Sequence, residues 1–302
     1  MTTRADHPVK VLVTGANGQL ARALCASAPQ EVVLRAVTRA ELDIGDLDSV
    51  QRCVEEFQPA MIINAAAYTL VDKAETEVAA AERGNVEGPR NLANAARETS
   101  AARLLHVSTD FVFDGVSSTP YQPDSQPAPL GVYGRTKQAG EQAVLEILGE
   151  RALIVRTAWV YDAHGKNFLR TMLRLMQERG AVRVVADQVG TPTCSHSLAQ
   201  VLWLFVQHPE LSGIYHWTDA GLASWYDFAV AIAEEALACG LLDSLPQVMP
   251  IATHEFPTPV RRPAYSVLDK SATHAALGLM PVHWRQRLRE VMQQVLADQA
   301  SA

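Results

Sequence analysis

The chain alternates between short runs of apolar, mostly β-branched residues and longer segments in which apolar residues recur every three or four positions. The runs predict buried strands, and the longer segments predict amphipathic helices. Their regular alternation in the first half is typical of an α/β fold with a doubly wound parallel sheet. The predicted strands are 9–14, 31–37, 61–67, 104–108 and 152–160, and the predicted helices are 18–28, 47–57 and 71–97.

The second half of the chain is less regular. Its predicted helices are 167–178, 195–207 and 223–238, and its predicted strands are 182–185 and 213–217. Ser195 is the predicted N-cap of its helix, because a serine hydroxyl accepts hydrogen bonds from the free backbone N–H groups there. The segment 246–263 is rich in proline and is predicted to be a loop.

A glycine-rich turn, Gly15-Ala16-Asn17-Gly18-Gln19-Leu20-Ala21, joins the first strand to the first helix. Glycine permits a tight turn and a close approach of the backbone to a pyrophosphate, and the helix N-terminus offers unpaired N–H groups. The alternative is a plain strand–turn–helix connection. The predicted cofactor contacts in this turn are Gly15, Asn17, Gly18, Gln19 and Leu20.

The second predicted strand is followed by Arg39, at the place where such folds bind the adenosine ribose. An acidic residue there accepts a hydrogen bond from the 2′-hydroxyl of NAD, whereas an arginine binds the 2′-phosphate of NADP. We therefore expect NADPH as the cofactor, with NADH as the alternative. Asp43 and Ile44 are expected to line the adenine pocket, and Asp46 is the predicted N-cap of the next helix.

Two further strands lead into small or polar residues. Ala65-Ala66-Ala67 leaves the backbone open to a ribose or a nicotinamide, although tight packing explains these alanines equally well. Ser108-Thr109-Asp110 ends the fourth strand, and ligands of open α/β sheets bind at the carboxyl ends of strands. Both segments are therefore predicted to face the cofactor or the substrate.

Tyr133 and Lys137 are four residues apart in a predicted helix, so both side chains lie on one face. A nearby ammonium favours the phenolate and lowers the pKa of a phenol from about 10, which makes it a better proton donor near neutral pH. Two solvated side chains are the alternative. Thr109 lies on the preceding βα unit, and we expect its hydroxyl to converge with this pair beside a nicotinamide.

A chain of 302 residues is long enough for two unequal domains. We predict a dinucleotide-binding domain at 1–165, to which 195–220 returns. A smaller, mixed α/β domain at 166–302 is expected to bind mainly the substrate.

Composition excludes several classes of partner. A net charge of −7 argues against binding to nucleic acid or to an anionic membrane surface. No apolar run reaches the roughly 18 residues of a membrane span, and the polar first ten residues lack an apolar signal segment. The four scattered cysteines form no CxxC pair, which favours free thiols in a reducing compartment. We therefore expect a soluble, cytoplasmic protein and predict no metal site.

The chain resembles the extended short-chain dehydrogenase/reductase family. The resemblance rests on Gly15-x-x-Gly18, Asn64-Ala65-Ala66-Ala67, Ser108-Thr109-Asp110 and Tyr133-x-x-x-Lys137. Within that family it is similar to the reductases of dTDP-linked 4-keto-6-deoxy sugars, from about residue 9 to about residue 295. The narrower similarity rests on Val71-Asp72-Lys73-Ala74-Glu75, Phe113-Asp114-Gly115, Arg156-Thr157-Ala158-Trp159, Asp187-Gln188-x-Gly190 and Pro257-Thr258-Pro259-x-x-Arg262-Pro263.

The resemblance implies reduction of dTDP-4-dehydro-β-L-rhamnose to dTDP-L-rhamnose by hydride transfer from NADPH, the last step of dTDP-L-rhamnose biosynthesis. It implies a triad in which Tyr133 protonates the C4 oxygen and Thr109 hydrogen-bonds the same oxygen. Lys137 would bind the nicotinamide ribose and hold down the pKa of the phenol. The implied substrate contacts are Thr109, Asp110, Tyr133, Trp159, Asn167 and Arg262.

Two other functions remain open. One is reduction of another nucleotide-linked 4-keto-6-deoxy sugar, and the other is a non-catalytic, NADP-binding regulatory subunit. The regulatory function predicts loss of the triad, yet all three residues are present. Some members of the family bridge a dimer through Mg²⁺ with a glutamate of the first helix, where this chain has Ala23. A metal-bridged dimer is therefore not expected, whereas a helix-mediated homodimer is left open.

Overall fold

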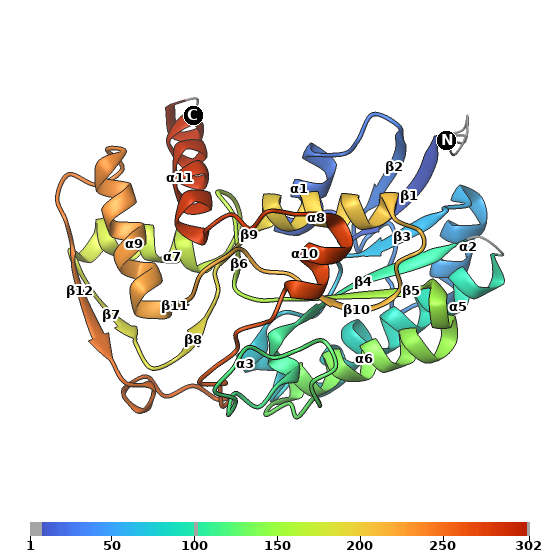
Figure 1. The fold of residues 1–302 in the computed structure, drawn as a ribbon, viewed down its shortest axis with the longest axis horizontal. Helices are drawn as coiled ribbons and strands as arrows, with labels where there is room; N and C mark the ends of the chain where they lie inside the picture. Colours follow the sequence, from blue (N-terminus) through green and yellow to red (C-terminus); the bar gives the residue numbers. More distant parts are fainter. Residues whose placement is uncertain (1–7, 100–101, 301–302) are drawn as a thin grey trace.

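The computed structural model describes residues 8–99 and 102–300. Most of the polar N-terminal segment considered above, residues 1–7, lies outside this part. A six-stranded parallel sheet forms the centre of the larger part of the molecule (Figure 1). In spatial order its strands are β10 (Gly213–His216), β5 (Ala152–Thr157), β4 (Arg103–Thr109), β3 (Met61–Asn64), β1 (Val9–Thr14) and β2 (Val32–Val37).

The chain runs from β1 outward to β2 and then returns to the other side of β1 at β3. This reversal makes the gap between β1 and β3 the topological switch point, where open α/β sheets bind their ligands. The predicted doubly wound α/β fold is confirmed.

Helices cover both faces of the sheet because strand side chains alternate between the faces. Val11 and Val13 point to one core and Leu12 points to the other. The first face is covered by α1 (Gln19–Ala26) and α8 (Ser195–Gln207). The second face is covered by α2 (Leu47–Phe57), α5 (Gly88–Glu98) and α6 (Val132–Leu148).

The rest of the chain packs around a second hydrophobic core, on the left in Figure 1. Three helices surround this core: α7 (Phe168–Arg179), α9 (Trp225–Ala238) and α11 (Trp284–Ala300). A two-stranded sheet of β7 (Ala181–Val185) and β12 (Gln247–Ile251) lies beside them. Helix α8 and strand β10 belong to the large sheet layer, while the division of the chain at residue 165 stays a prediction.

Two predictions about individual residues are confirmed. Asp46 caps α2, because its carboxylate accepts from the N–H groups of Asp48 and Ser49. All four cysteines are free, as predicted. Among the described helices, none is long and apolar enough to cross a membrane.

The segment from 61 to 97 departs from the predicted long strand and long helix. Strand β3 stops at Asn64, whose side-chain Oδ1 accepts from the Ala66 N–H at 3.2 Å and turns the chain. The helical segment is broken into α3 (Val71–Ala74), α4 (Val78–Glu82), the π-helical turn η1 (Arg83–Glu87) and α5. In η1 the buried Asn85 hydrogen-bonds the Tyr68 backbone and the Thr136 hydroxyl, and these bonds hold the irregular turn.

Three other predictions are wrong. The proline-rich segment 246–263 contains β12, which pairs in parallel with β7, and its Pro250 is tolerated because each strand of a two-stranded sheet has a free edge. Strand β5 stops at Thr157 instead of reaching residue 160. The N-cap of α8 is Cys194, since the Ser195 hydroxyl donates to the Asp162 carboxylate instead.

Helix α6 is held against the sheet by close polar and backbone contacts. The Glu75 carboxylate accepts from the Val132 N–H at 2.7 Å and so caps the first turn of the helix. A Cβ on Gly134 would lie 2.2 Å from the Phe111 carbonyl oxygen, and the backbone therefore approaches where only glycine fits.

A buried ion pair fixes the middle of the same helix. The Glu141 Oε2 atom of α6 accepts from Arg156 Nη2 of β5 at 2.7 Å, and both side chains are 2% exposed. Arg156 also donates to the Pro123 carbonyl, so the pair ties the loop before α6 to the sheet.

We expect Glu141→Ala to lower the free energy of unfolding by about 3–5 kcal/mol, because it leaves the Arg156 charge buried and unpaired. Urea denaturation followed by circular dichroism measures this. The matched control is Glu178→Ala, which breaks the exposed Arg174–Glu178 pair of α7 and should cost less than about 1 kcal/mol. Equal effects of the two substitutions would show that the buried pair does not fix α6.

Candidate active site

The glycine-rich turn lies directly against the alanines that follow β3. Gly15 has φ +78°, and a Cβ on it would lie 2.9 Å from both Cα and N of Ala66. Helix α1 begins after Gly18, and no side chain of the described residues caps its first turn. The turn therefore lets a ligand approach the backbone closely and leaves the N–H groups of the first turn of α1 without side-chain partners, and both features fit a pyrophosphate.

The other predicted residues of this turn have different environments. Asn17 is exposed, whereas Leu20 belongs to the core beneath α1. The Gln19 Nε2 atom donates to the Val160 carbonyl at 2.9 Å, and its Oε1 atom accepts from Asn167 Nδ2 at 3.3 Å. Gln19 thus connects the turn to the second part of the chain.

The structure places Arg39 just after β2 with its side chain 81% exposed, free to meet a phosphate from solvent. Its Nη2 atom lies 3.7 Å from Asp43 Oδ2, and Arg83 Nη2 lies 3.0 Å from the same oxygen. Arg83 is a second cation at this place that sequence reasoning missed. Ile44 is buried against Gly88, and its carbonyl accepts from Asn91 Nδ2 at 2.9 Å.

Tyr133 and Thr109 meet at the carboxyl end of β4, as predicted. Burial raises the pKa of the Tyr133 phenol to about 12, the Thr109 hydrogen bond opposes this rise and the Asp110 charge adds to it. The expectation that Lys137 lowers the pKa of this phenol is wrong for this structure. The Lys137 ammonium is directed at the Val107 carbonyl, 2.7 Å from its Nζ atom.

The amine of Lys137 and the carboxyl group of Asp110, both near the phenol, also have shifted pKa values. Burial lowers the pKa of Lys137 to about 8, and the charge of Glu141 partly offsets this. Burial raises the pKa of Asp110 to about 6, opposed by hydrogen bonds with Ser266 and Thr109. A phenol that keeps its proton at neutral pH beside a lysine that gives one up more readily than usual suits transfer of a proton to a substrate oxygen.

His106 is a site residue that sequence reasoning missed. It lies in β4, is fully buried, and places its Nε2 atom 3.2 Å from Lys137 Nζ. Its Nδ1 atom lies 2.9 Å from Asn64 Nδ2. Burial, with the Lys137 charge, holds the pKa of this imidazole well below its usual value, so it is neutral. A histidine inside an otherwise apolar strand was the available signal, because buried polar groups need partners.

A narrow cleft adjoins the phenol on the side of the second core. Its lining residues are Phe111, Trp159, Gln188, Trp225, Arg262, Pro263 and Ser266. The Phe111 ring meets the Tyr133 ring edge-on, with 5.7 Å between centroids. Arg262 is held by Asp72, whose Oδ2 atom is 2.9 Å from Nη2. The cleft therefore offers an anchored cation and aromatic faces next to the proton donor.

Trp159 adopts φ +48°, which is rare for a bulky residue and is held here by packing. Its ring stacks on Trp225 with 3.5 Å between centroids. Trp225 and Gln188 were not predicted as site residues, although Gln188 lies in one of the motifs quoted above. Asn167 does not line the cleft: its Oδ1 atom accepts from the Arg170 N–H and caps α7.

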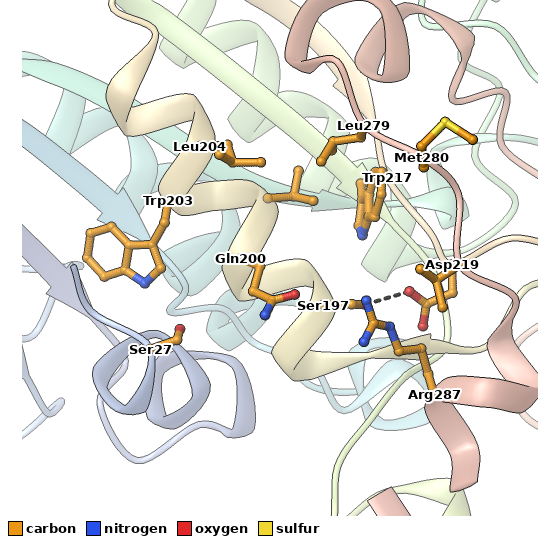
Figure 2. A pocket seen from close by; sticks show the side chains of 12 residues that line it. Ser27, Ser197, Gln200, Trp203, Leu204, Trp217, Asp219, Leu279, Met280 and Arg287 are labelled. Carbon is orange, nitrogen blue, oxygen red and sulfur yellow. Dashed lines mark hydrogen bonds between the residues drawn. The ribbon is translucent and has the colours of Figure 1, made fainter. Parts of the chain in front are cut away.

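A separate cavity of about 350 Å³ lies between α1, α8 and the start of α11 (Figure 2). Its polar lining residues are Ser27, Ser197, Gln200, Trp217, Asp219 and Arg287. None of the predicted catalytic residues lines it, so we place the chemistry at the carboxyl edge of the sheet.

Buried hydroxyls at that edge lack partners in the structure. Ser108 Oγ and Thr157 Oγ1, at the ends of β4 and β5, have no hydrogen-bond partner among the described residues. Buried polar atoms of this kind are normally satisfied, so they indicate a place where a polar ligand binds. Together with the uncapped α1 and the close Gly15 turn, they fit a dinucleotide.

Comparisons with known proteins agree with this geometry. The model of the family described as "RmlD substrate binding domain" matches residues 9–297. The dTDP-4-dehydrorhamnose reductase of Aggregatibacter actinomycetemcomitans is 43% identical over 93% of this chain and 98% of its own. The dTDP-4-keto-6-deoxy-D-glucose reductase of Streptomyces niveus is 44% identical over 96% of this chain and 98% of its own.

A solved structure is similar throughout. The crystal structure of dTDP-4-dehydrorhamnose reductase from Bacillus anthracis in complex with NADP is 37% identical and superposes with a TM-score of 0.89. The match covers 95% of this chain and 99% of that one. The chain therefore belongs to the family of the dTDP-4-dehydrorhamnose reductases.

Proposed function

We propose that this protein reduces the 4-keto group of dTDP-4-dehydro-β-L-rhamnose with NADPH and so forms dTDP-L-rhamnose, the last step of dTDP-L-rhamnose biosynthesis. The observation that carries the proposal is the meeting of Thr109 and Tyr133 beside the buried Lys137 at the carboxyl edge of the sheet. Membership of the reductase family supports the same activity.

The residues of the chain divide the work as follows. Tyr133 donates its proton to the C4 oxygen, and its raised pKa keeps the phenol protonated until the substrate binds. Thr109 hydrogen-bonds the same oxygen and orients it toward the phenol. NADPH, when bound, supplies the hydride. Gly15, Gly18 and the first turn of α1 would hold its pyrophosphate, and Arg39 its 2′-phosphate.

The cleft beside Tyr133 would hold the nucleotide-sugar. Arg262, anchored by Asp72, presents its remaining N–H groups to the diphosphate, because a guanidinium matches phosphate geometry. The Trp159–Trp225 stack offers a flat face to the sugar or the base. Asp110 Oδ1 accepts from the Thr109 hydroxyl at 3.0 Å and so holds this side chain beside the cleft.

The direct test measures loss of NADPH absorbance with enzymatically generated dTDP-4-dehydro-β-L-rhamnose and, in parallel, with dTDP-4-dehydro-6-deoxy-D-glucose. We expect a much higher kcat/KM for the first sugar. A preference for the second would assign the chain to another 4-keto-6-deoxy sugar. No oxidation of NADPH by protein that binds NADPH would support the regulatory function instead.

Tyr133→Phe should lower kcat roughly 10²–10⁴-fold and leave the Kd for NADPH almost unchanged, because only the proton donor is lost. Stopped-flow rates and NADPH fluorescence titration measure the two quantities. Tyr215→Phe is the matched control, since Tyr215 lies on β10 and packs against Phe205 instead of the site. A Tyr133→Phe enzyme with the wild-type kcat would remove Tyr133 from the mechanism.

Arg39→Asp should lower the NADPH/NADH ratio of kcat/KM roughly tenfold to a hundredfold, because a charged hydrogen bond to the 2′-phosphate is lost. Arg52→Asp, on the exposed face of α2, makes the same change in net charge and should leave the ratio unchanged. If Arg39→Asp also leaves it unchanged, Arg83 becomes the residue to test.

We also propose that the protein is cytoplasmic, which the four free thiols support because reduced cysteines persist in that compartment. A homodimer stays a prediction.

A further inference from the structure

A line of buried polar groups runs from the end of β1 to the catalytic lysine. It consists of Thr14, Asn64, His106 and Lys137, each of which is at most 2% exposed. Thr14 Oγ1 donates to Asn64 Oδ1 at 2.7 Å, Asn64 Nδ2 lies 2.9 Å from His106 Nδ1, and His106 Nε2 lies 3.2 Å from Lys137 Nζ. Of these four residues, only Lys137 was predicted from the sequence to be catalytic.

A backbone group fixes the orientation of the Asn64 amide. The Ala66 N–H is always a donor, and it points at Asn64 Oδ1 from 3.2 Å. The Thr14 hydroxyl donates to the same oxygen. If the amide were turned around, its NH₂ group would face the Ala66 N–H, and two donors would oppose each other. Asn64 therefore directs its NH₂ group at His106.

The orientation of Asn64 in turn fixes the tautomer of His106. An N–H of Asn64 requires a lone pair on His106 Nδ1, so Nδ1 carries no proton. The imidazole is fully buried and neutral, and a neutral imidazole carries one proton. That proton is therefore on Nε2, the nitrogen that faces Lys137.

The Lys137 amine group thus faces the N–H of His106 Nε2, although a lysine ammonium needs a hydrogen-bond acceptor there. An ammonium group has three donors and no acceptor, so its hydrogens oppose the Nε2–H, whereas a neutral amine accepts from it. The amine still donates to the Val107 carbonyl at 2.7 Å. We propose that His106 is a positioning residue that donates a hydrogen bond to Lys137 Nζ and so weakens the hold of Lys137 on its third proton.

Other charged groups around Lys137 do not reverse this effect. Glu141, one turn away on α6, favours the ammonium, but its carboxylate is engaged by Arg156. Tyr133, on the same helix, is uncharged at neutral pH, and Asp110 acts on Tyr133. Two groups of β4 contact Lys137 Nζ: the Val107 backbone carbonyl and the His106 side chain.

The inference rests on the proposed function for its catalytic meaning. When Tyr133 has given its proton to the keto oxygen, a phenolate remains. A net transfer of one proton from the Lys137 ammonium restores the phenol and leaves the neutral amine, which His106 stabilises. Nδ1 of His106 faces an amide N–H, so the proton goes no further along this line.

The first test reads the tautomer without cofactor or substrate. Long-range ¹H–¹⁵N spectra of the histidine-labelled full chain distinguish the two neutral tautomers, and His106→Gln identifies the His106 signals. His216 is an internal control, because its Nδ1 atom faces the Tyr121 carbonyl at 3.1 Å and must carry the proton. We expect Nε2–H for His106 and Nδ1–H for His216. An Nδ1–H tautomer of His106, or an imidazolium near pH 7, would overturn the proposal.

The second test follows the charge of Lys137 itself. The chain has five lysines, Lys10, Lys73, Lys137, Lys166 and Lys270, so ¹³Cε-lysine spectra are simple, and Lys137→Met assigns the signal. We expect a midpoint at about 8 in the wild type. In His106→Gln the midpoint should rise by roughly one to two pH units, because the glutamine amide is free to turn its oxygen to Nζ.

An unchanged midpoint in a folded His106→Gln protein would show that burial alone controls Lys137, and the proposal would fail. Should this variant not fold, the tautomer of the wild type decides the matter, with the His106 signals assigned through backbone connectivities instead. Neither experiment uses turnover, so a negative result here is distinct from a failure of the reductase function.

Discussion

Burial of a single lysine is the constraint on which the rest of the site depends. Lys137 is 2% exposed, and no carboxylate of the described residues hydrogen-bonds its Nζ atom. A buried cation is costly unless its hydrogens have acceptors, so the Val107 carbonyl must lie at a fixed place relative to α6. The cap from Glu75, the glycine contacts and the Glu141–Arg156 pair supply that precision.

The same burial prepares the chemistry. A water-poor environment disfavours both charged forms, and it therefore moves the pKa of Tyr133 up and that of Lys137 down. Burial thus makes the Tyr133 phenolate a stronger base and the Lys137 ammonium a stronger acid than in water, where the two pKa values nearly coincide, so a proton passes favourably from the ammonium to the phenolate. The sign of the Tyr133 shift also shows why proximity in sequence misleads: an ammonium four residues away acts on the phenol only if it points there, and here it points at β4.

Sequence patterns correctly predicted the features that depend only on residues close together in the chain. The helix 47–57 and its Asp46 cap agree with the structure residue for residue, because amphipathic spacing and an N-cap are properties of a few neighbouring residues. Strand β12 was missed because its pairing with β7 overrides a proline that argues against a strand. The contacts of His106, the Asp72–Arg262 pair and the Trp159–Trp225 stack join residues far apart in the chain, and no local pattern contains them.

This difference separates the two halves of the site. The cofactor turn, β4 and α6 come from the regular sheet layer, where backbone contacts at Gly15 and Gly134 leave little freedom. The substrate cleft is assembled from Phe111, Trp159, Trp225 and the Arg262 segment, which meet only in the folded chain. In the proposed mechanism the hydride and proton transfers need only the first half, so we expect changes in the second half to alter which sugar is held and not how it is reduced. We therefore expect the substrate choice of this protein to depend on the long-range contacts of the cleft.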